Sequence, residues 1–145
     1  MAKMSVYLLK IDDAMARWRD IEKVLAPAMR FSQGKYQLTD IYEDVRSNYA
    51  QAWIAESSAQ IHGVAITQIV RYPRKVMLFI TMLAGKDFCL WDNIVNDCLI
   101  PYAKQHGCDG IEFLGRPGWD RRAKPLGFNP ALTVFELNLK DIGGH

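Results

Sequence analysis

The sequence predicts an α/β fold (α+β in arrangement) in which helices accompany a mixed central sheet. Three observations lead to this prediction. A long apolar run at 76–84 is typical of a strand that is buried on both faces. An amphipathic helix pattern follows at 87–106, and a second apolar strand follows at 110–114. This strand, helix, strand unit predicts a right-handed crossover between two parallel strands.

Composition is that of an ordinary globular protein. Half of the 145 residues are hydrophobic, and 18 basic against 16 acidic residues give a net charge of +2. A domain of this length buries roughly two thirds of its unfolded surface. A chain so close to neutral requires neither nucleic acid nor an anionic membrane as a partner. The chain shows no signal-peptide core and no apolar run of transmembrane length, so we expect no membrane association.

The three cysteines are Cys89, Cys98 and Cys108. They form no CxxC pair, and no histidine stands at zinc-finger spacing from them. We therefore expect reduced thiols in a cytoplasmic protein and no metal site.

The N-terminal region predicts a strand and then a helix. Residues 5–11 carry apolar side chains and are expected to form the first strand. Asp12 or Asp13 is expected to cap the following helix, because a short polar side chain accepts hydrogen bonds from the free amides of a first turn. Pro27 predicts a kink or an early stop, and this helix should close before Gly34.

The middle of the chain changes from helical to strand periodicity. Residues 31–38 are polar and are expected to form a loop over a site, and a shorter helix should begin near Thr39. Apolar residues then recur with a period of two at 49–56 and 61–70. The basic turn 71–75 leads into the long apolar strand. These three strands are expected to form an antiparallel meander.

The C-terminal region predicts a short helix at 119–125 and a last strand at 131–139. The apolar residues of that strand are Leu132, Val134, Phe135, Leu137 and Leu139. The complete order is β-α-α-β-β-β-α-β-α-β, in one domain over 1–145.

This order of elements resembles that of the GNAT superfamily, the acyl-CoA-dependent N-acetyltransferases. The resemblance covers nearly the whole chain, and the sequence Leu126-Gly127-Phe128 fits the closing motif of that family. It implies that residues 83–91 form the wall for acetyl-CoA or CoA and that an amine is the acyl acceptor. Topology alone carries no chemistry, so the site residues need their own argument.

The resemblance implies a set of cofactor-binding residues. They are Thr81, Leu83, Gly85, Lys86, Asp87, Phe88 and Arg116. Backbone amides at a helix start favour an anion by about 0.3–1 kcal/mol. Thr81 either bonds a pantetheine arm or satisfies a neighbouring carbonyl, and Arg116 either binds a phosphate or belongs to a solvated helix face.

The chemistry departs from the family pattern at three places, one of which is Arg116, where the family has an asparagine. The family's loop glycines fall near Asp87, Phe88, Leu90 and Asp92, and none of these is glycine. The family's general-acid tyrosine falls at Ala123, which has no proton to donate. The resemblance therefore implies a degenerate member.

Glu112 is the candidate catalytic residue. It lies between Ile111 and Phe113 in the second parallel strand. Its carboxylate either serves as a general base through an ordered water or forms a structural ion pair.

The segment 112–119, with its Gly-Arg-Pro-Gly-Trp sequence, also looks like a GNAT-like subgroup encoded by tailed bacteriophages. Two hypotheses follow. In the first, the protein transfers an acyl group to a small-molecule or protein amine held by the region 31–42. In the second, it is a catalytically silent binding or structural module with a protein partner, virion-associated or directed at a bacterial host.

Overall fold

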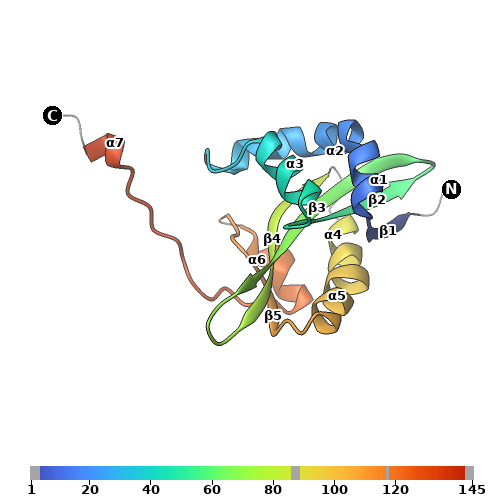
Figure 1. The fold of residues 1–145 in the computed structure, drawn as a ribbon. Coiled ribbons are helices and arrows are strands. Elements are labelled where there is room, and N and C mark those ends of the chain that lie inside the picture. The colour runs from blue at the N-terminus through green and yellow to red at the C-terminus, as the bar shows by residue number, and fades with distance from the viewer. Residues whose placement is uncertain (1–3, 86–88, 117, 143–145) are drawn as a thin grey trace. The chain divides into compact units, whose positions relative to one another are not determined.

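The computed structural model describes residues 4–85, 89–116 and 118–142. These residues belong to two compact units, Met1–Leu114 and Gly115–His145. The first unit contains a mixed sheet with helices on both of its faces (Figure 1). The predicted α/β class is confirmed, while the prediction of a single domain over 1–145 stays a prediction.

The five strands lie side by side in the sheet in the same order as in the sequence. They are β1 (Ser5–Leu8), β2 (Gln51–Ser57), β3 (Gln60–Arg71), β4 (Val76–Gly85) and β5 (Gly110–Phe113). The pairs from β1 to β4 are antiparallel, and β4 pairs with β5 in parallel. The predicted meander and the predicted parallel pair are both confirmed.

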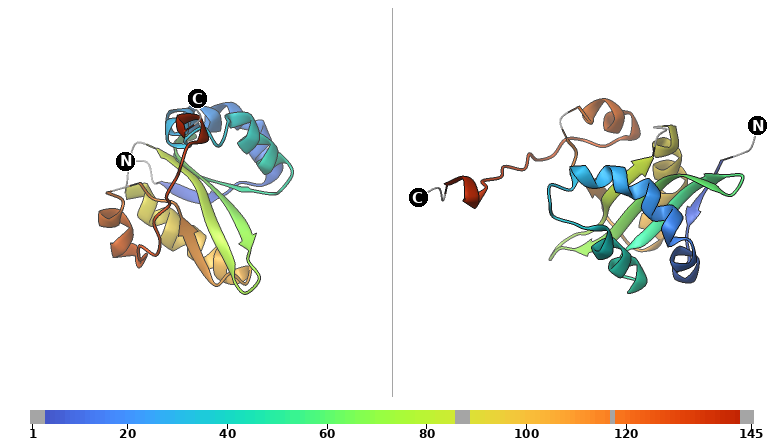
Figure 2. Two further views of the ribbon diagram at one scale, coloured as in Figure 1. Left: turned by 90° about the vertical axis from the view of Figure 1, so that its left-hand side faces the viewer. Right: turned by 90° about the horizontal axis from the view of Figure 1, so that it is seen from above.

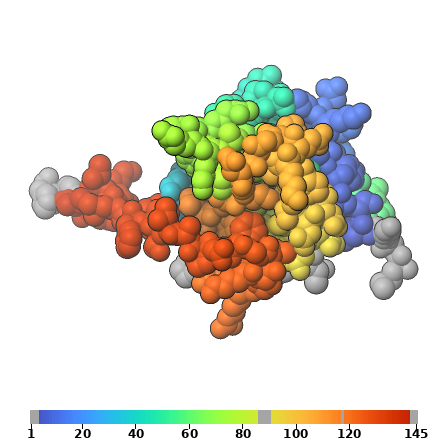
Figure 3. Space-filling model, turned by 90° about the horizontal axis from the view of Figure 1, so that it is seen from below, coloured from blue at the N-terminus to red at the C-terminus, as the bar shows by residue number. Residues whose placement is uncertain are grey.

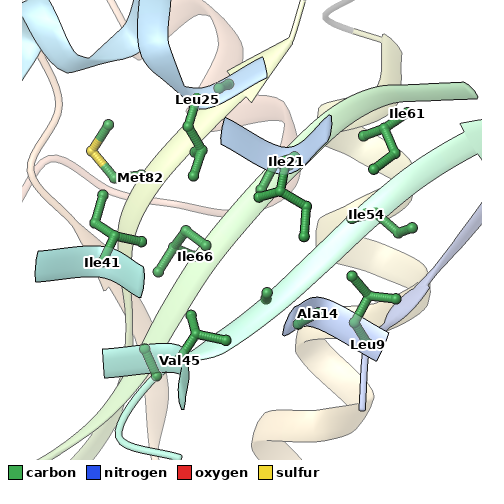
Figure 4. Close-up of a cluster of buried hydrophobic side chains, with 14 residues drawn as sticks. Leu9, Ala14, Ile21, Leu25, Ile41, Val45, Ile54, Ile61, Ile66 and Met82 are labelled. Atoms are coloured by element: carbon green, nitrogen blue, oxygen red, sulfur yellow. The ribbon is translucent and has the colours of Figure 1, made fainter. Parts of the chain in front are cut away.

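One face of the sheet is covered by the helices α1 (Ile11–Ala16), α2 (Trp18–Leu25) and α3 (Leu38–Arg46), with the 3-10 helix η1 (Ala26–Phe31) after α2. Figure 2 shows these helices on the side of the sheet opposite α5 (Ile100–Gln105). Figure 4 shows Ile21, Leu25 and Ile41 pointing at strand residues such as Ile66. Their side chains are 0–2% exposed, and burial of each contributes about 1.5–3 kcal/mol.

The first strand and first helix differ from their predicted bounds. The strand ends at Leu8, and α1 begins at Ile11. Asp12 and Asp13 therefore lie in the first turn of α1. Their negative charges interact favourably with the positive end of the helix dipole, but neither residue caps the helix. As expected for Pro27, α2 ends at Leu25, and the chain continues as a 3-10 helix with the proline in its first turn.

The opposite face is covered by one interrupted helix. It consists of α4 (Cys89–Asn93), the π-helical turn η2 (Ile94–Leu99) and α5 (Ile100–Gln105). Pro101 explains the interruption, because a proline has no amide for the helical ladder and its ring crowds the preceding turn. The amide of Ile100 accordingly bonds to the carbonyl of Val95, five residues back.

Aromatic pairs join this helix to the sheet. Trp53 of β2 packs edge-on against Tyr102 of α5, with ring centroids 5.1 Å apart. Trp91 of α4 packs in the same way against Phe113 of β5, at 5.6 Å. Such geometry adds about 0.5–1.5 kcal/mol per pair to the burial of the rings.

The second unit contains α6 (Asp120–Ala123), the 3-10 turn η3 (Lys124–Leu126) and α7 (Leu139–Ile142). The short helix predicted at 119–125 is present as α6 and η3. Gly127 ends it with a φ of 96°, in the left-handed region that glycine tolerates best.

The last strand was predicted wrongly. Residues 131–138 have no regular secondary structure, and Leu139 begins a helix. Apolar alternation shows that a segment fits a pleated surface, but a strand also needs a second strand to receive its backbone hydrogen bonds. Among the described residues, no strand pairs with this segment.

Candidate functional site

The free edge of β4 is the central feature of the candidate site. The parallel pairing with β5 extends from Met77 opposite Gly110 to Ile80 opposite Phe113. β4 then continues to Gly85, so its backbone from Thr81 onward has no neighbouring strand on that side among the described residues. Open α/β sheets bind ligands beyond the carboxyl ends of their parallel strands, and the free edge of β4 lies at that end of the parallel pair.

A β-bulge lies where this free edge begins. Thr67 of β3 is opposite Ile80, and Ile66 is opposite Met82, so Thr81 has no cross-strand partner. The extra residue moves the following side chains to the other face of the sheet. Accordingly, Met82 belongs to the core beneath α1 to α3, whereas Ile80 shares the face of Thr67 and Trp53.

The hydroxyl of Thr81 is buried at this bulge. Its Oγ1 is shielded from solvent and has no hydrogen-bond partner among the described residues. A buried polar atom without a partner costs about 1–3 kcal/mol, which makes such atoms uncommon. Among the described residues, no backbone carbonyl accepts a hydrogen bond from this hydroxyl, so the structural role considered for Thr81 is not seen.

Two further candidate residues follow on β4. Leu83 is half-buried and lies opposite Ala65. Gly85 lies opposite Gly63, and a Cβ atom added to it would come within 2.8 Å of the carbonyl oxygen of His62. The close approach of β3 thus explains the glycine at position 85 without any ligand.

Glu112 lies on β5 opposite Phe79. Its Oε1 accepts a 2.6 Å hydrogen bond from the hydroxyl of Tyr72, in the turn between β3 and β4. The carboxylate raises the pKa of Tyr72, because the hydrogen bond and the nearby negative charge both oppose loss of the phenolic proton. The described partner of Glu112 is therefore a tyrosine rather than the arginine of an ion pair.

The same turn is fixed to the start of β5. The amide of Asp109 donates to the carbonyl of Val76 at 2.7 Å, and the amide of Val76 donates to Oδ2 of Asp109 at 2.9 Å. Figure 3 shows the β3–β4 hairpin, in yellow-green, beside the orange segment that leads from α5 into β5. Tyr72 and Glu112 are held together by this clamp, and no sequence motif connects the two positions.

The structure describes only some of the remaining candidates for cofactor binding. Lys86, Asp87 and Phe88 lie outside the described residues. Arg116 belongs to the second unit, where its side chain is exposed. In that same unit Ala123, at the family's tyrosine position, is buried in α6.

A buried polar network was missed from the sequence. Nε1 of Trp53 donates to Oγ1 of Thr67 at 2.9 Å, and that hydroxyl donates to Oε1 of Gln51 at 2.9 Å. Thr67 is fully buried, and the network fixes the orientation of Trp53 beneath α5. Strand periodicity predicts that Thr67 faces the core but not which polar atoms meet it there.

Cys98 and Cys108 have the chemistry of core thiols. Burial raises the pKa of both Cys98 and Cys108, so neither is activated as a thiolate. Among the described residues no group of histidine, cysteine or acidic side chains is arranged to hold a metal ion. Within the same part of the chain, no helix has the length and hydropathy needed to cross a membrane.

One small cavity lies away from this site. Its volume is about 180 Å³, and it lies between the junction of β1 with α1, the end of α3, and Tyr102. Pockets for small ligands usually enclose about 300–1,000 Å³. We therefore assign it no ligand.

Comparisons with known proteins agree on the fold. A predicted acetyltransferase from Clostridium acetobutylicum, solved with acetyl-CoA, superposes with a TM-score of 0.67 at 18% identity, and the match covers 99% of this chain and 100% of that chain. A GCN5-related N-acetyltransferase from Ralstonia eutropha gives a TM-score of 0.65 at 13% identity, covering 94% of this chain and 99% of that chain. The chain has the GNAT fold.

A further GNAT-fold structure matches to a similar degree. Glucosamine-6-phosphate N-acetyltransferase from Arabidopsis thaliana gives a TM-score of 0.66 at 14% identity, covering 93% of this chain and 98% of that chain. The sequence matches no protein-family model and no curated protein. The similarity thus extends to the course of the backbone, and the chemistry has to be argued from the site.

Proposed function

We propose that this protein is an N-acyltransferase that moves an acyl group from an acyl-CoA thioester to an amine. The observation that carries the proposal is the edge of β4 that no described strand covers, with the buried hydroxyl of Thr81 at its start, which has no hydrogen-bond partner among the described residues. The solved GNAT-fold acetyltransferases, one of them with acetyl-CoA, support it by analogy of fold.

The donor fits this edge chemically. The pantetheine arm of CoA carries amide groups, and an extended chain with amides pairs with an exposed strand edge as an added strand does. We assign Thr81 to a hydrogen bond with this arm, and Leu83 and Gly85 to the wall beside it. We further propose Lys86, Asp87 and Phe88 as the continuation of this wall, and Arg116 as a side chain that binds a phosphate.

The reaction needs a base and a held acceptor. The amine nitrogen attacks the thioester carbonyl carbon, so a C–N bond forms, the C–S bond breaks, and the thiolate leaves with a proton. We assign to Glu112 the removal of the amine proton through a water. Oε1 accepts from Tyr72, and Oε2 is the oxygen assigned to that water. The acceptor would be held by the region 31–42, between η1 and α3.

A silent protein with the same fold is the second candidate. Two observations favour it. Ala123 cannot donate a proton from the family's tyrosine position, and Glu112 already accepts a hydrogen bond from Tyr72. In this case the protein would be a degenerate, phage-encoded module that binds a protein partner, in the virion or in the cytoplasm of a bacterial host.

Calorimetric titration of the purified protein with acetyl-CoA and with CoA tests the donor site. We expect a Kd near the micromolar range, which corresponds to a binding free energy of about −8 kcal/mol, and a rise in the melting temperature of the protein. Pantetheine, which lacks the phosphates, separates the contribution of the β4 edge from that of the following loop. The absence of heat and of any thermal shift at millimolar ligand would refute the proposal.

Turnover separates the two candidates. Free thiol released from acetyl-CoA is measured against a panel of small amines and lysine peptides. Glu112→Gln is expected to lower turnover by about 10²–10⁴-fold, as removal of a general base does, while Tyr72→Phe retains the carboxylate and serves as its control. Binding of acetyl-CoA without turnover on any amine would favour the silent module.

A further inference from the structure

A serine and a histidine meet in the hairpin between β2 and β3. Oγ of Ser57 lies 2.8 Å from Nε2 of His62, and neither side chain has another hydrogen bond among the described residues. A neutral imidazole carries one N–H, so the contact uses either that N–H or the serine O–H. In both cases the pair keeps one donor, the hydroxyl or Nδ1–H, for an acceptor outside the hairpin.

The backbone of this hairpin is unusual on both sides of the pair. Ile61 lies opposite Glu56 and Gly63 lies opposite Ala55, so His62 is the extra residue of a β-bulge. Bulges re-aim a side chain and are frequent beside functional sites. The bulge therefore accounts for an imidazole that turns toward the end of β2.

The turn that follows Ser57 is strained. Ser58 and Ala59 have φ angles of 51° and 62°, in the left-handed region that residues other than glycine adopt at a cost. Two-residue hairpin loops of this kind usually contain Asn-Gly, which relieves the strain. Strained backbone gathers where a site fixes the geometry, and here it lies directly between the two interacting side chains.

The Ser57–His62 pair lies at the end of β4. The carbonyl oxygen of His62 is 2.8 Å from the position of a Cβ added to Gly85. Ser57 follows Trp53 at an even spacing along β2, so its side chain points to the face that carries α4 and α5. On that face α4 begins at Cys89, shortly after β4 ends. A group that extends beyond the end of β4 on this face comes close to the pair.

The carboxylate next to the pair points away from it. Glu56 precedes Ser57 in β2 and so lies on the opposite face, where it accepts hydrogen bonds from Arg17 and Tyr7. The positive charge of Arg17 compensates that of Glu56. The carboxylate therefore does not oppose an anion at the Ser57–His62 pair.

We propose that Ser57 and His62 bind a phosphate group of the acyl-CoA donor. Phosphate oxygens accept hydrogen bonds, which matches the donor that the pair keeps, and protonation of the imidazole supplies a further donor and a positive charge. The chain has no glycine at positions 87, 88, 90 and 92, and the pair provides side-chain donors for the phosphates from a neighbouring strand. This inference rests on the proposed function and adds two residues to its donor site.

Calorimetry with three ligands tests the contact. Ser57→Ala and His62→Phe should each bind CoA about tenfold more weakly than the native protein does, and both should bind pantetheine, which lacks the phosphates, with native affinity. His106→Phe is the matched control, because His106 is an exposed histidine at the end of α5; its affinity for CoA should be unchanged. Dephospho-CoA separates the two phosphate sources: a loss that persists with it assigns the contact to the diphosphate, and a loss that disappears assigns it to the 3′-phosphate.

Nuclear magnetic resonance provides a readout on the native chain that needs no variant to fold. The ring signals of His62 should shift when CoA is added and stay in place with pantetheine, while those of His106 stay in place with both. Unshifted His62 signals in a protein that binds CoA would overturn this inference and leave the proposed function intact. Unchanged CoA affinity in both variants, or an equal loss for pantetheine, would do the same. A native protein that binds neither ligand would refute the proposed function and this inference together.

Discussion

The hydroxyl of Tyr72 donates a 2.6 Å hydrogen bond to Oε1 of Glu112, forty positions away in the sequence. The contact joins the β3–β4 turn to the last strand of the sheet, next to the point where β4 and β5 cease to pair. Glu112 is therefore held by the scaffold before any substrate arrives. Its carboxylate is oriented by a residue whose turn the sequence analysis did not connect with the site.

The Tyr72–Glu112 contact predicts a loss of stability at alkaline pH. Because the pKa of Tyr72 is raised in the folded protein, the native state keeps the phenolic proton at a pH where the unfolded chain has lost it. The free energy of unfolding should fall as pH rises from about 10, the ordinary tyrosine value, through the native pKa. Thermal unfolding of the native protein and of Tyr72→Phe at pH 8 to 11 measures this; a constant difference between them across that range would contradict it.

A second prediction concerns acid. Glu56 accepts hydrogen bonds from Tyr7 and, at 2.7 Å, from Nη2 of Arg17. The hydrogen bond from Arg17 holds the pKa of Glu56 below its ordinary value. The native state thus binds this proton only at lower pH than the unfolded chain does, so the stabilisation is present above about pH 4.3 and is lost as pH falls through the native pKa.

Arg17→Met measures that contribution, because methionine retains much of the aliphatic stem without the charge. The variant should be less stable by up to about 1 kcal/mol at pH 7, the range of a partly exposed ion pair. Urea unfolding should show the stabilities of the two proteins converging as pH falls through the native pKa of Glu56. Equal stability at neutral pH would mean that the pair contributes nothing to folding.

Gly85 provides a stability test that is independent of ligand binding. Its φ is 151°, and a Cβ would lie 2.8 Å from the carbonyl oxygen of His62. Gly85→Ala should lower the free energy of unfolding by about 1–3 kcal/mol. Gly107→Ala is the control, since Gly107 also has a positive φ, 71°, but no atom within 4 Å of an added Cβ. Urea unfolding that gave both variants the same small cost would contradict the clash.

The order of the strands was predictable because it rests on local periodicity. The apolar run 76–84 predicts a strand buried on both faces, and the pattern after it predicts the helix that makes β4 and β5 parallel. The strand and the parallel pair are present in the structure, although buried and half-buried positions alternate along β4. The interruption before Pro101 was missed although the proline was visible, because apolar spacing continues through a π-helical turn.

The site was less predictable because it depends on register. Sequence spacing places Thr81 on β4, but only the offset between Ile66 and Thr67 in the ladder reveals the bulge. For Gly85 the sequence suggested a cofactor loop, whereas its pairing with Gly63 shows a requirement of the sheet itself. The prediction of a strand in this C-terminal segment, where 131–138 has no regular structure, failed for a different reason. An alternating apolar pattern carries no information about the strand that would pair with it.

The buried hydroxyl of Thr81 is expected to lower the stability of the fold and to raise the affinity for the acyl donor. Valine has nearly the shape of threonine without the hydroxyl, so Thr81→Val removes a buried oxygen that has no partner among the described residues. The free energy of unfolding should rise by up to about 1–3 kcal/mol. If the hydroxyl bonds the donor, the affinity for acetyl-CoA should fall roughly tenfold, which corresponds to about 1.4 kcal/mol.

Thr81→Ser separates the hydroxyl from the methyl group. Serine retains the oxygen and loses one buried methyl, so this variant should be less stable than the native protein by about 1 kcal/mol while it binds acetyl-CoA normally. Urea unfolding and calorimetry on the same three proteins provide both quantities. If the valine variant is more stable and its affinity for acetyl-CoA is unchanged, the hydroxyl lowers stability at the bulge and binds no ligand. A valine variant that loses stability would mean that the oxygen has a partner within the folded chain.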